Sequence, residues 1–164
     1  MSKIYKIKYK FSIEKLNDEV VEKTIKYFES RRFKCQLENK RIVGKRGNTI
    51  GNLFSYDMTK LICNLNVEFF KNDITVEFFV NSKFQDITKV NLASFEIEQL
   101  LLPYYLNNEP KPDFLNEYLT MSKESALKWT LSLTILGRKL PDELKTKIES
   151  LANENEYPEV TEIK

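Results

Sequence analysis

The sequence contains no histidine among its 164 residues. Histidine is the side chain whose ordinary pKa lies closest to neutral pH. Its absence removes the usual general acid or base, the Ser-His and Cys-His nucleophile pairs and the commonest metal ligand. The two cysteines, Cys35 and Cys63, are too few and too far apart in the chain for a structural zinc site. We therefore expect no metal and no cofactor, and we assign no catalytic residue.

Glycine, proline and net charge are also low, because the chain has 4 Gly, 5 Pro and a formal net charge of +2. A charge of this size does not by itself indicate binding to nucleic acid. No apolar run approaches the roughly 18–20 residues of a membrane span, and the first residues interleave lysines with apolar side chains, unlike a secretory signal. We expect a cytoplasmic protein whose cysteines are reduced and packed as small apolar side chains.

Residues 61–81 carry the clearest structural pattern in the chain. On either side of the polar turn Lys71–Asp73, every second residue is apolar. The members of this set are Leu61, Cys63, Leu65, Val67, Phe69, Ile74, Val76, Phe78 and Val80. A period of two residues over two adjacent runs predicts an antiparallel hairpin with one face buried.

Shorter runs with the same period predict further strands, at residues 3–13, 33–38, 41–45 and 53–56. In the first of these runs, lysines occupy the positions that would face solvent. Lysines along one face are typical of an edge strand, because they discourage pairing with another sheet.

A period of 3.6 residues predicts a helix that Asn17 caps and that ends near Arg31 and Arg32, where cations are favoured. A second helix should begin near Thr88 or Asn91, and Pro103 should kink or end it. Beyond residue 110 the period stays helical until an acidic tail.

These elements predict an α+β fold, with a curved antiparallel sheet of about five strands in the order β-α-β-β-β-β-α and a C-terminal helical extension. We expect a core domain at residues 1–108. The helical extension, residues 113–152, should pack on the core or on a partner. Residues 153–164 should form a flexible acidic tail.

The basic residues gather in one part of the chain, because residues 31–46 contain seven cations and only one acid, Glu38. They include the glycine-flanked pair Lys45 and Arg46, although the flanking residues are patterned as strands and not as the helices that a KH-type loop joins. The candidates for contact with an anion or a partner are Arg31, Arg32, Lys34, Arg41, Lys45, Arg46 and Asn48. The alternatives are solvated cations, ion pairs within the chain, and a loop whose glycines supply left-handed backbone angles.

Several aromatic residues do not fit the inward positions of the expected strands and helices. We consider Phe70, Phe79, Tyr104 and Tyr105 as candidates for an interface, where aromatic side chains are enriched. The alternative is that the C-terminal helices cover them.

Residues 45–61, KRGNTIGNLFSYDMTKL, resemble a segment of a group of small uncharacterised bacterial proteins with the pattern R-G-x-x-x-G-N-L-x-S-[FY]-D-M-x-K-L. Residues 84–88 resemble the segment after the hairpin in those proteins, and the resemblance covers about residues 33–101. It implies a shared α+β fold and attaches no activity to it.

These features favour a non-enzymatic binding module that acts through protein–protein contact or self-association. The alternative is binding of nucleic acid or another anionic ligand through the basic region at residues 31–46, and an enzyme built on Asn52, Tyr56 and Asp57 is a third possibility. We expect a protein partner or a homo-oligomer, with no membrane and no metal involved.

Overall fold

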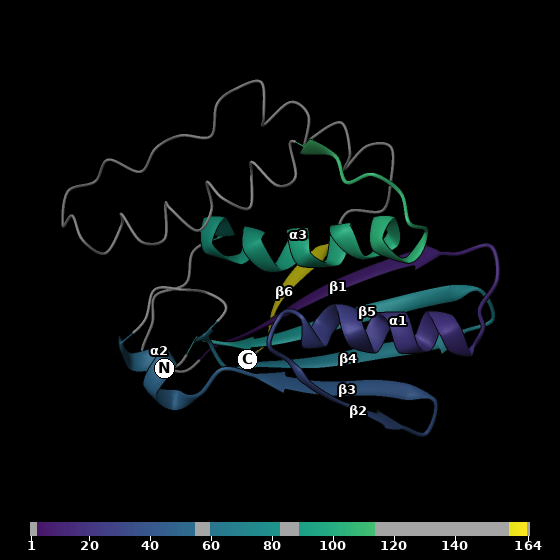
Figure 1. Ribbon diagram of the computed structural model, residues 1–164. Helices are drawn as coiled ribbons and strands as arrows, with labels where there is room; N and C mark the ends of the chain where they lie inside the picture. Colours follow the sequence, from purple (N-terminus) through teal and green to yellow (C-terminus); the bar gives the residue numbers. More distant parts are fainter. Residues whose placement is uncertain (1–2, 55–59, 83–88, 114–157, 164) are drawn as a thin grey trace.

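The computed structural model describes residues 3–54, 60–82, 89–113 and 158–163, which form an antiparallel sheet with two long helices packed on one face (Figure 1). The strands lie in the order β2-β3-β4-β5-β1-β6. The elements along the chain are β1 (Ile4–Ser12), α1 (Asp18–Glu29), β2 (Lys34–Glu38), β3 (Arg41–Arg46), α2 (Thr49–Phe54), β4 (Cys63–Phe70), β5 (Asp73–Asn81), α3 (Lys89–Leu106) and β6 (Glu159–Ile163). The predicted α+β class with a curved antiparallel sheet is confirmed.

The hairpin predicted at residues 61–81 is formed by β4 and β5, which pair from Cys63 opposite Val80 to Phe70 opposite Asp73. The alternating apolar set faces the helices, and all of its members are buried except Phe69, which is partly buried against the core. The alternation therefore fixes which face of the sheet is the inner face.

β1 does not lie at the edge of the sheet, contrary to the sequence prediction, because it pairs with β5 on one side and with β6 on the other. Its lysines pair instead with acids of β5: Lys6 Nζ lies 2.6 Å from Glu77 and Lys10 Nζ lies 2.8 Å from Asp73. β6 is a second departure from the prediction, which assigns residues 153–164 to a flexible tail. Pairing with β1 orders residues 159–163 of that tail.

Helix α1 begins where the sequence predicts, with the Asn17 side chain accepting a hydrogen bond from the Val20 N–H at 2.9 Å. Helix α3 runs through Pro103 and ends at Leu106, so of the two predicted effects of this proline, a kink or the end of the helix, the second is wrong. Proline removes one backbone hydrogen bond. The buried side chains on both sides of it, Leu102 and Leu106, offset that loss by packing in the core.

The prediction of a short strand at residues 53–56 is also wrong, because residues 49–54 form helix α2. The Asn48 side chain accepts a hydrogen bond from the Gly51 N–H at 2.7 Å and so caps this helix. A helix of six residues is too short to show a helical period in its sequence. The helical extension predicted at residues 113–152 lies almost entirely outside the described residues.

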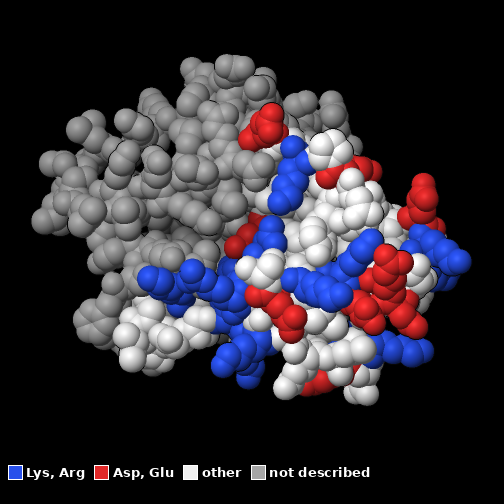
Figure 2. Space-filling model, in the orientation of Figure 1, with Lys and Arg blue, Asp and Glu red and all other residues white. Residues whose placement is uncertain are grey.

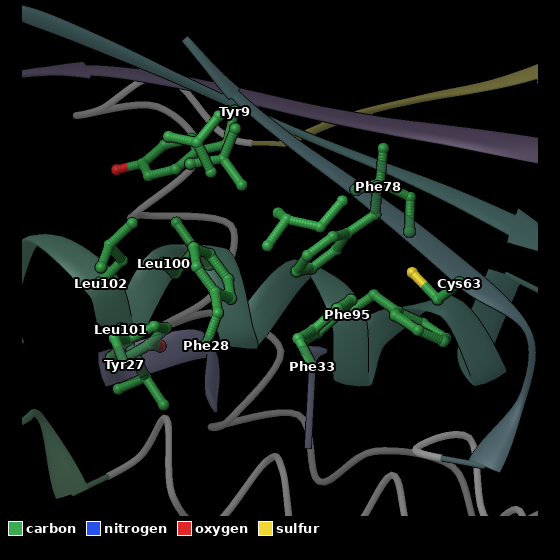
Figure 3. Close-up of a cluster of buried hydrophobic side chains, with 14 of the residues drawn as sticks. Tyr9, Tyr27, Phe28, Phe33, Cys63, Phe78, Phe95, Leu100, Leu101 and Leu102 are labelled. Carbon is green, nitrogen blue, oxygen red and sulfur yellow. The ribbon is translucent and has the colours of Figure 1, made fainter. Parts of the chain in front are cut away.

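The core is a layer of aromatic and aliphatic side chains between the inner face and the two long helices, with α3 over β1 and α1 near β2 (Figures 1 and 3). Phe78 lies at its centre. The Phe78 ring stacks on Phe33 with centroids 5.5 Å apart and meets Phe28 and Phe95 edge-on at 5.9 and 6.0 Å. None of the helices in the described part of the chain is long and apolar enough to cross a membrane.

Replacing Phe78 by alanine should lower the free energy of unfolding by about 3–5 kcal/mol, because the side chain is fully buried and its removal leaves a cavity. Phe70→Ala is the matched control: Phe70 lies on the adjacent strand with 70% of its surface exposed, and its loss should change stability by less than about 0.5 kcal/mol. Chemical denaturation measures both values. Equal losses for the two variants would contradict the assignment of inner and outer faces.

Candidate functional site

The outer face of the sheet carries the polar residues that alternate with the core. Because paired residues lie on the same face, the strand pairing aligns outward side chains into rows across the sheet. The row at one end contains Lys34, Lys45, Asn64, Phe79 and Lys6, from β2 to β1. Helices α1 and α3 both cover the opposite face (Figure 1), so this row faces away from the core.

A hollow of about 560 Å³ lies over strands β2 to β5 on this outer face. It is lined by Lys34, Gln36, Glu38, Arg41, Val43, Gly44, Lys45, Asn64, Leu65, Asn66 and Phe79. Three of these residues are cationic and only one is acidic. The lining therefore combines positive charge with neutral amide groups and one aromatic ring.

The two lysines of the hollow have an unusual placement. Lys34 and Lys45 are directly opposite each other on β2 and β3, and like charges in that position repel. Both are exposed, and within the described residues neither forms an ion pair. Lys6, at the other end of the same row, is balanced by Glu77. The positive charge at the β2–β3 end of the row is thus not compensated by described acids.

Phe79 lies beside this charge, partly buried, with Lys6 Nζ 5.5 Å from the centre of its ring. In the next row of the hollow, the Asn66 amide donates toward Glu68 and Glu77 at 3.3 and 3.5 Å. Its Oδ1 atom is shielded from solvent and has no hydrogen-bond partner among the described residues. The hollow therefore offers an aromatic surface and unused amide capacity next to its cations.

Of the seven residues that the sequence suggested for anion or partner contact, three line the hollow: Lys34, Arg41 and Lys45. Arg32 is exposed in the connection between α1 and β2, and Asn48 caps α2. Arg31 belongs to the helix side of the molecule, where its guanidinium lies 3.5 Å from the centre of the Tyr27 ring and donates to the Tyr27 carbonyl at 3.2 Å.

Arg46 is buried in the core and forms an ion pair with Glu98 of α3. Its Nη1 and Nη2 atoms lie 3.0 and 2.8 Å from the two carboxylate oxygens, and Nη1 also donates to the Arg31 carbonyl at 3.1 Å. The guanidinium carbon is 4.3 Å from the centre of the Phe33 ring. This geometry makes Arg46 a structural residue and removes it from the surface. The period of β3, with Ile42 facing inward, could have shown this in the sequence.

The two glycines near Arg46 also have structural roles. Gly44 lies within β3, where a Cβ atom would come within 3.1 Å of the Leu65 side chain. Gly47 adopts φ +78°, and a Cβ atom there would lie 2.0 Å from the Leu61 carbonyl oxygen. These contacts explain the glycine-flanked segment without a bound phosphate.

The aromatic candidates do not form one surface. Phe70 and Phe79 lie at opposite ends of the β4–β5 hairpin, where they pair with Asp73 and Asn64. Tyr104 and Tyr105 belong to α3 on the helix side, with the Tyr105 ring 5.2 Å from that of Tyr27. Among the four, only Phe79 lies in the hollow.

The described residues hold no group of three or more Cys, Asp or Glu side chains arranged to bind a metal ion. Burial raises the pKa of the Cys63 thiol to about 12 and that of Cys35 to about 11, so both thiols are protonated at neutral pH. Tyr56 and Asp57, suggested above for an enzyme, lie outside the described residues, as does the side chain of Asn52.

Comparison of the chain with protein-family models, curated proteins and solved structures finds no match in any of the three. The likeness of residues 45–61 to small bacterial proteins therefore stays a resemblance.

Replacing Glu98 by alanine should lower the free energy of unfolding by about 3–5 kcal/mol, because the variant leaves a buried guanidinium without its carboxylate. The control is the double variant Arg46→Met with Glu98→Leu, which removes both charges and should recover part of that loss. Thermal and chemical unfolding measure the two effects. A double variant that is less stable than the single one would show that the pair itself, and not the unpaired charge, dominates.

The thiols should react slowly with Ellman's reagent in the folded protein at pH 8, because burial shields both from the reagent and raises their pKa values well above that pH. Cys35, which is half-buried, should react faster than Cys63. Both should react at once in denaturant. Rapid labelling of Cys63 in the folded state would contradict its position in the core.

Proposed function

We propose that the protein is a non-enzymatic binding module and that the hollow on its outer face holds an acidic segment of another protein. The observation that carries this proposal is the pair formed by Lys34 and Lys45, neither of which forms an ion pair with an acid in the described part of the chain. Opposed lysines on neighbouring strands cost stability in the free protein. A carboxylate placed between them relieves that repulsion. The repulsion is already present in the folded, unbound protein, so its relief adds to the free energy of binding.

The other groups in the hollow suit a peptide chain. Amide side chains from Gln36, Asn64 and Asn66 can exchange hydrogen bonds with peptide groups, and Phe79 with Val43 offers an apolar surface for a side chain. Positive charge next to apolar surface fits a segment in which acidic and apolar residues alternate.

A second candidate is a ligand bearing phosphate groups, such as single-stranded nucleic acid. Phe79 could stack on a base while Lys34, Arg41 and Lys45 contact phosphates. The charge of the protein argues less strongly for this ligand. The net charge is only +2, acids share the outer face, and basic and acidic side chains are interspersed over the face seen in Figure 2.

Binding of a fluorescein-labelled peptide of alternating glutamate and leucine tests the first candidate by fluorescence anisotropy. The double variant Lys34→Glu with Lys45→Glu should lower the affinity at least tenfold, because it reverses both charges of the pair. Lys8→Glu is the matched control: Lys8 is exposed on the same face of β1 outside the hollow, and its reversal should change the affinity less than about twofold.

A fluorescein-labelled oligothymidylate of equal length tests the second candidate in the same assay. Binding that prefers the oligonucleotide and falls steeply with salt would favour phosphate recognition, because counterion release dominates such binding. If the double variant and Lys8→Glu change the affinity equally, neither the peptide nor the oligonucleotide binds in the hollow.

A further inference from the structure

Strand β2 forms one edge of the sheet as far as the chain is described, and it has the features of a pairing site. Its inward-facing Leu37 is 57% exposed, although the equivalent positions on β3 and β4, Ile42 and Val67, are fully buried. An exposed leucine at the open end of an apolar layer indicates that the layer can continue onto another strand.

The turn after β2 shows which backbone groups point outward from this edge. Asn39 and Lys40 both have positive φ, +48° and +63°, as in a two-residue hairpin turn. The residues that flank such a turn, Glu38 and Arg41, form a hydrogen-bonded pair, and bonded pairs then alternate along the strands. The N–H and C=O groups of Cys35 and Leu37 therefore point away from β3, toward the open edge.

The sequence of β2, Lys-Cys-Gln-Leu-Glu, is complementary to itself in the antiparallel direction. We propose that β2 pairs with β2 of a second copy of this chain about a two-fold axis at Gln36, so that two sheets join into one. In this register Lys34 lies opposite Glu38 of the other copy, and Cys35 lies opposite Leu37. The outward backbone groups of Cys35 and Leu37 then exchange hydrogen bonds with those of the other copy.

This register satisfies both faces of the sheet. On the outer face, Lys34 gains a carboxylate from the second copy, which offsets its repulsion from Lys45. On the inner face, Leu37 meets Cys35 of the other copy and extends the apolar layer across the axis. Charged residues on an edge usually prevent pairing. Here the two-fold register places each charged residue opposite one of the other sign, Lys34 against Glu38 of the second copy.

Pairing through β6, the other edge, is less favourable. An antiparallel β6–β6 pair centred on Thr161 would place Glu162 against Val160 and would pair neither acid with a cation. Pairing of β2 with β6 of another copy would place Glu38 opposite Glu159. This contact joins two different edges, so it would add copy after copy and form an open fibre. The β2–β2 contact is closed, because the two-fold axis uses the same edge of both copies.

Sedimentation velocity over a hundredfold range of protein concentration, up to roughly 0.5 mM, tests the pairing. One short strand makes an interface at the low end of specific contacts, so a reversible dimer should appear toward the upper end of this range. Lys34→Glu and Glu38→Lys should each shift the midpoint of dimerisation upward at least tenfold, since each places like charges opposite. The double variant Lys34→Glu with Glu38→Lys should restore dimerisation.

A wild-type protein that stays monomeric over the whole range, or a double variant that fails to restore the dimer, would overturn the proposal. Both charged residues are exposed, so the variants should fold, and their thermal unfolding checks this. The test contains no peptide and is therefore independent of the proposed acidic partner. Lys45→Glu provides a further distinction, because it should weaken peptide binding and leave the dimer in place.

A thiol introduced by Gln36→Cys, in a Cys35→Ala background, tests the register. On the two-fold axis the two Cα atoms of a non-bonded antiparallel pair lie about 4.5 Å apart, within the range that a disulfide spans. Oxidised glutathione, which is reduced as the two thiols join, should convert most of this variant to a covalent dimer. Lys8→Cys in the same background should stay monomeric, and equal cross-linking of the two variants would contradict the register.

Discussion

The packing of Phe78 against aromatic side chains from outside the sheet determines the layout of the molecule. Phe78 comes from β5, at the middle of the sheet, and its ring contacts Phe28 of α1 and Phe95 of α3. Both long helices are therefore held on the same face. Because the side chains of a strand alternate strictly, this contact also decides which residues of every other strand face outward. The open outer face is a consequence of one-sided packing, and the hollow over β2 to β5 exists because no aromatic layer forms there among the described residues.

The same alternation of side chains places one charged residue, Arg46, in the core, where it needs a partner of opposite charge. Arg46 follows Ile42 and Gly44 on the inner side of β3, and α3 supplies Glu98 in a two-pronged ion pair with it. The guanidinium also donates to the Arg31 carbonyl and lies 4.3 Å and 5.2 Å from the centres of the Phe33 and Phe95 rings. Burying an ion pair costs solvation that its attraction only partly returns. The ion pair therefore serves mainly to position helix α3. Its two directional hydrogen bonds fix α3 relative to the end of β3, whereas an apolar contact would allow the helix to shift.

Much of this fold could be predicted from local patterns, and the parts that could not depend on distant contacts. The β4–β5 hairpin and the Asn17 cap follow from residues that are neighbours in the chain. Strand β6 could not be predicted, because it is polar and is ordered by β1, which precedes it by about 150 residues. In the site, the outward position of Lys45 and the inward position of Arg46 follow from the period of β3. The opposition of Lys34 and Lys45 follows only once the two-residue turn sets the register.

Strand β2 links the two surfaces on which binding is proposed. Its outward side chains Lys34, Gln36 and Glu38 line the hollow, and the edge that it forms in the described sheet lies next to them. A two-fold axis through an antiparallel strand pair is perpendicular to the sheet, so both copies present their outer faces on the same side. The two hollows then adjoin across the axis, and Arg41 of each copy follows the Lys34–Glu38 pair in the same row. An acidic segment long enough to cross the axis would meet both hollows, and its second contact would be intramolecular. Self-association would thus act in two opposed ways, because Glu38 of the other copy would also occupy the side of Lys34 that a carboxylate of the segment could otherwise approach, which leaves Lys45 and Arg41 as the main cations of each hollow.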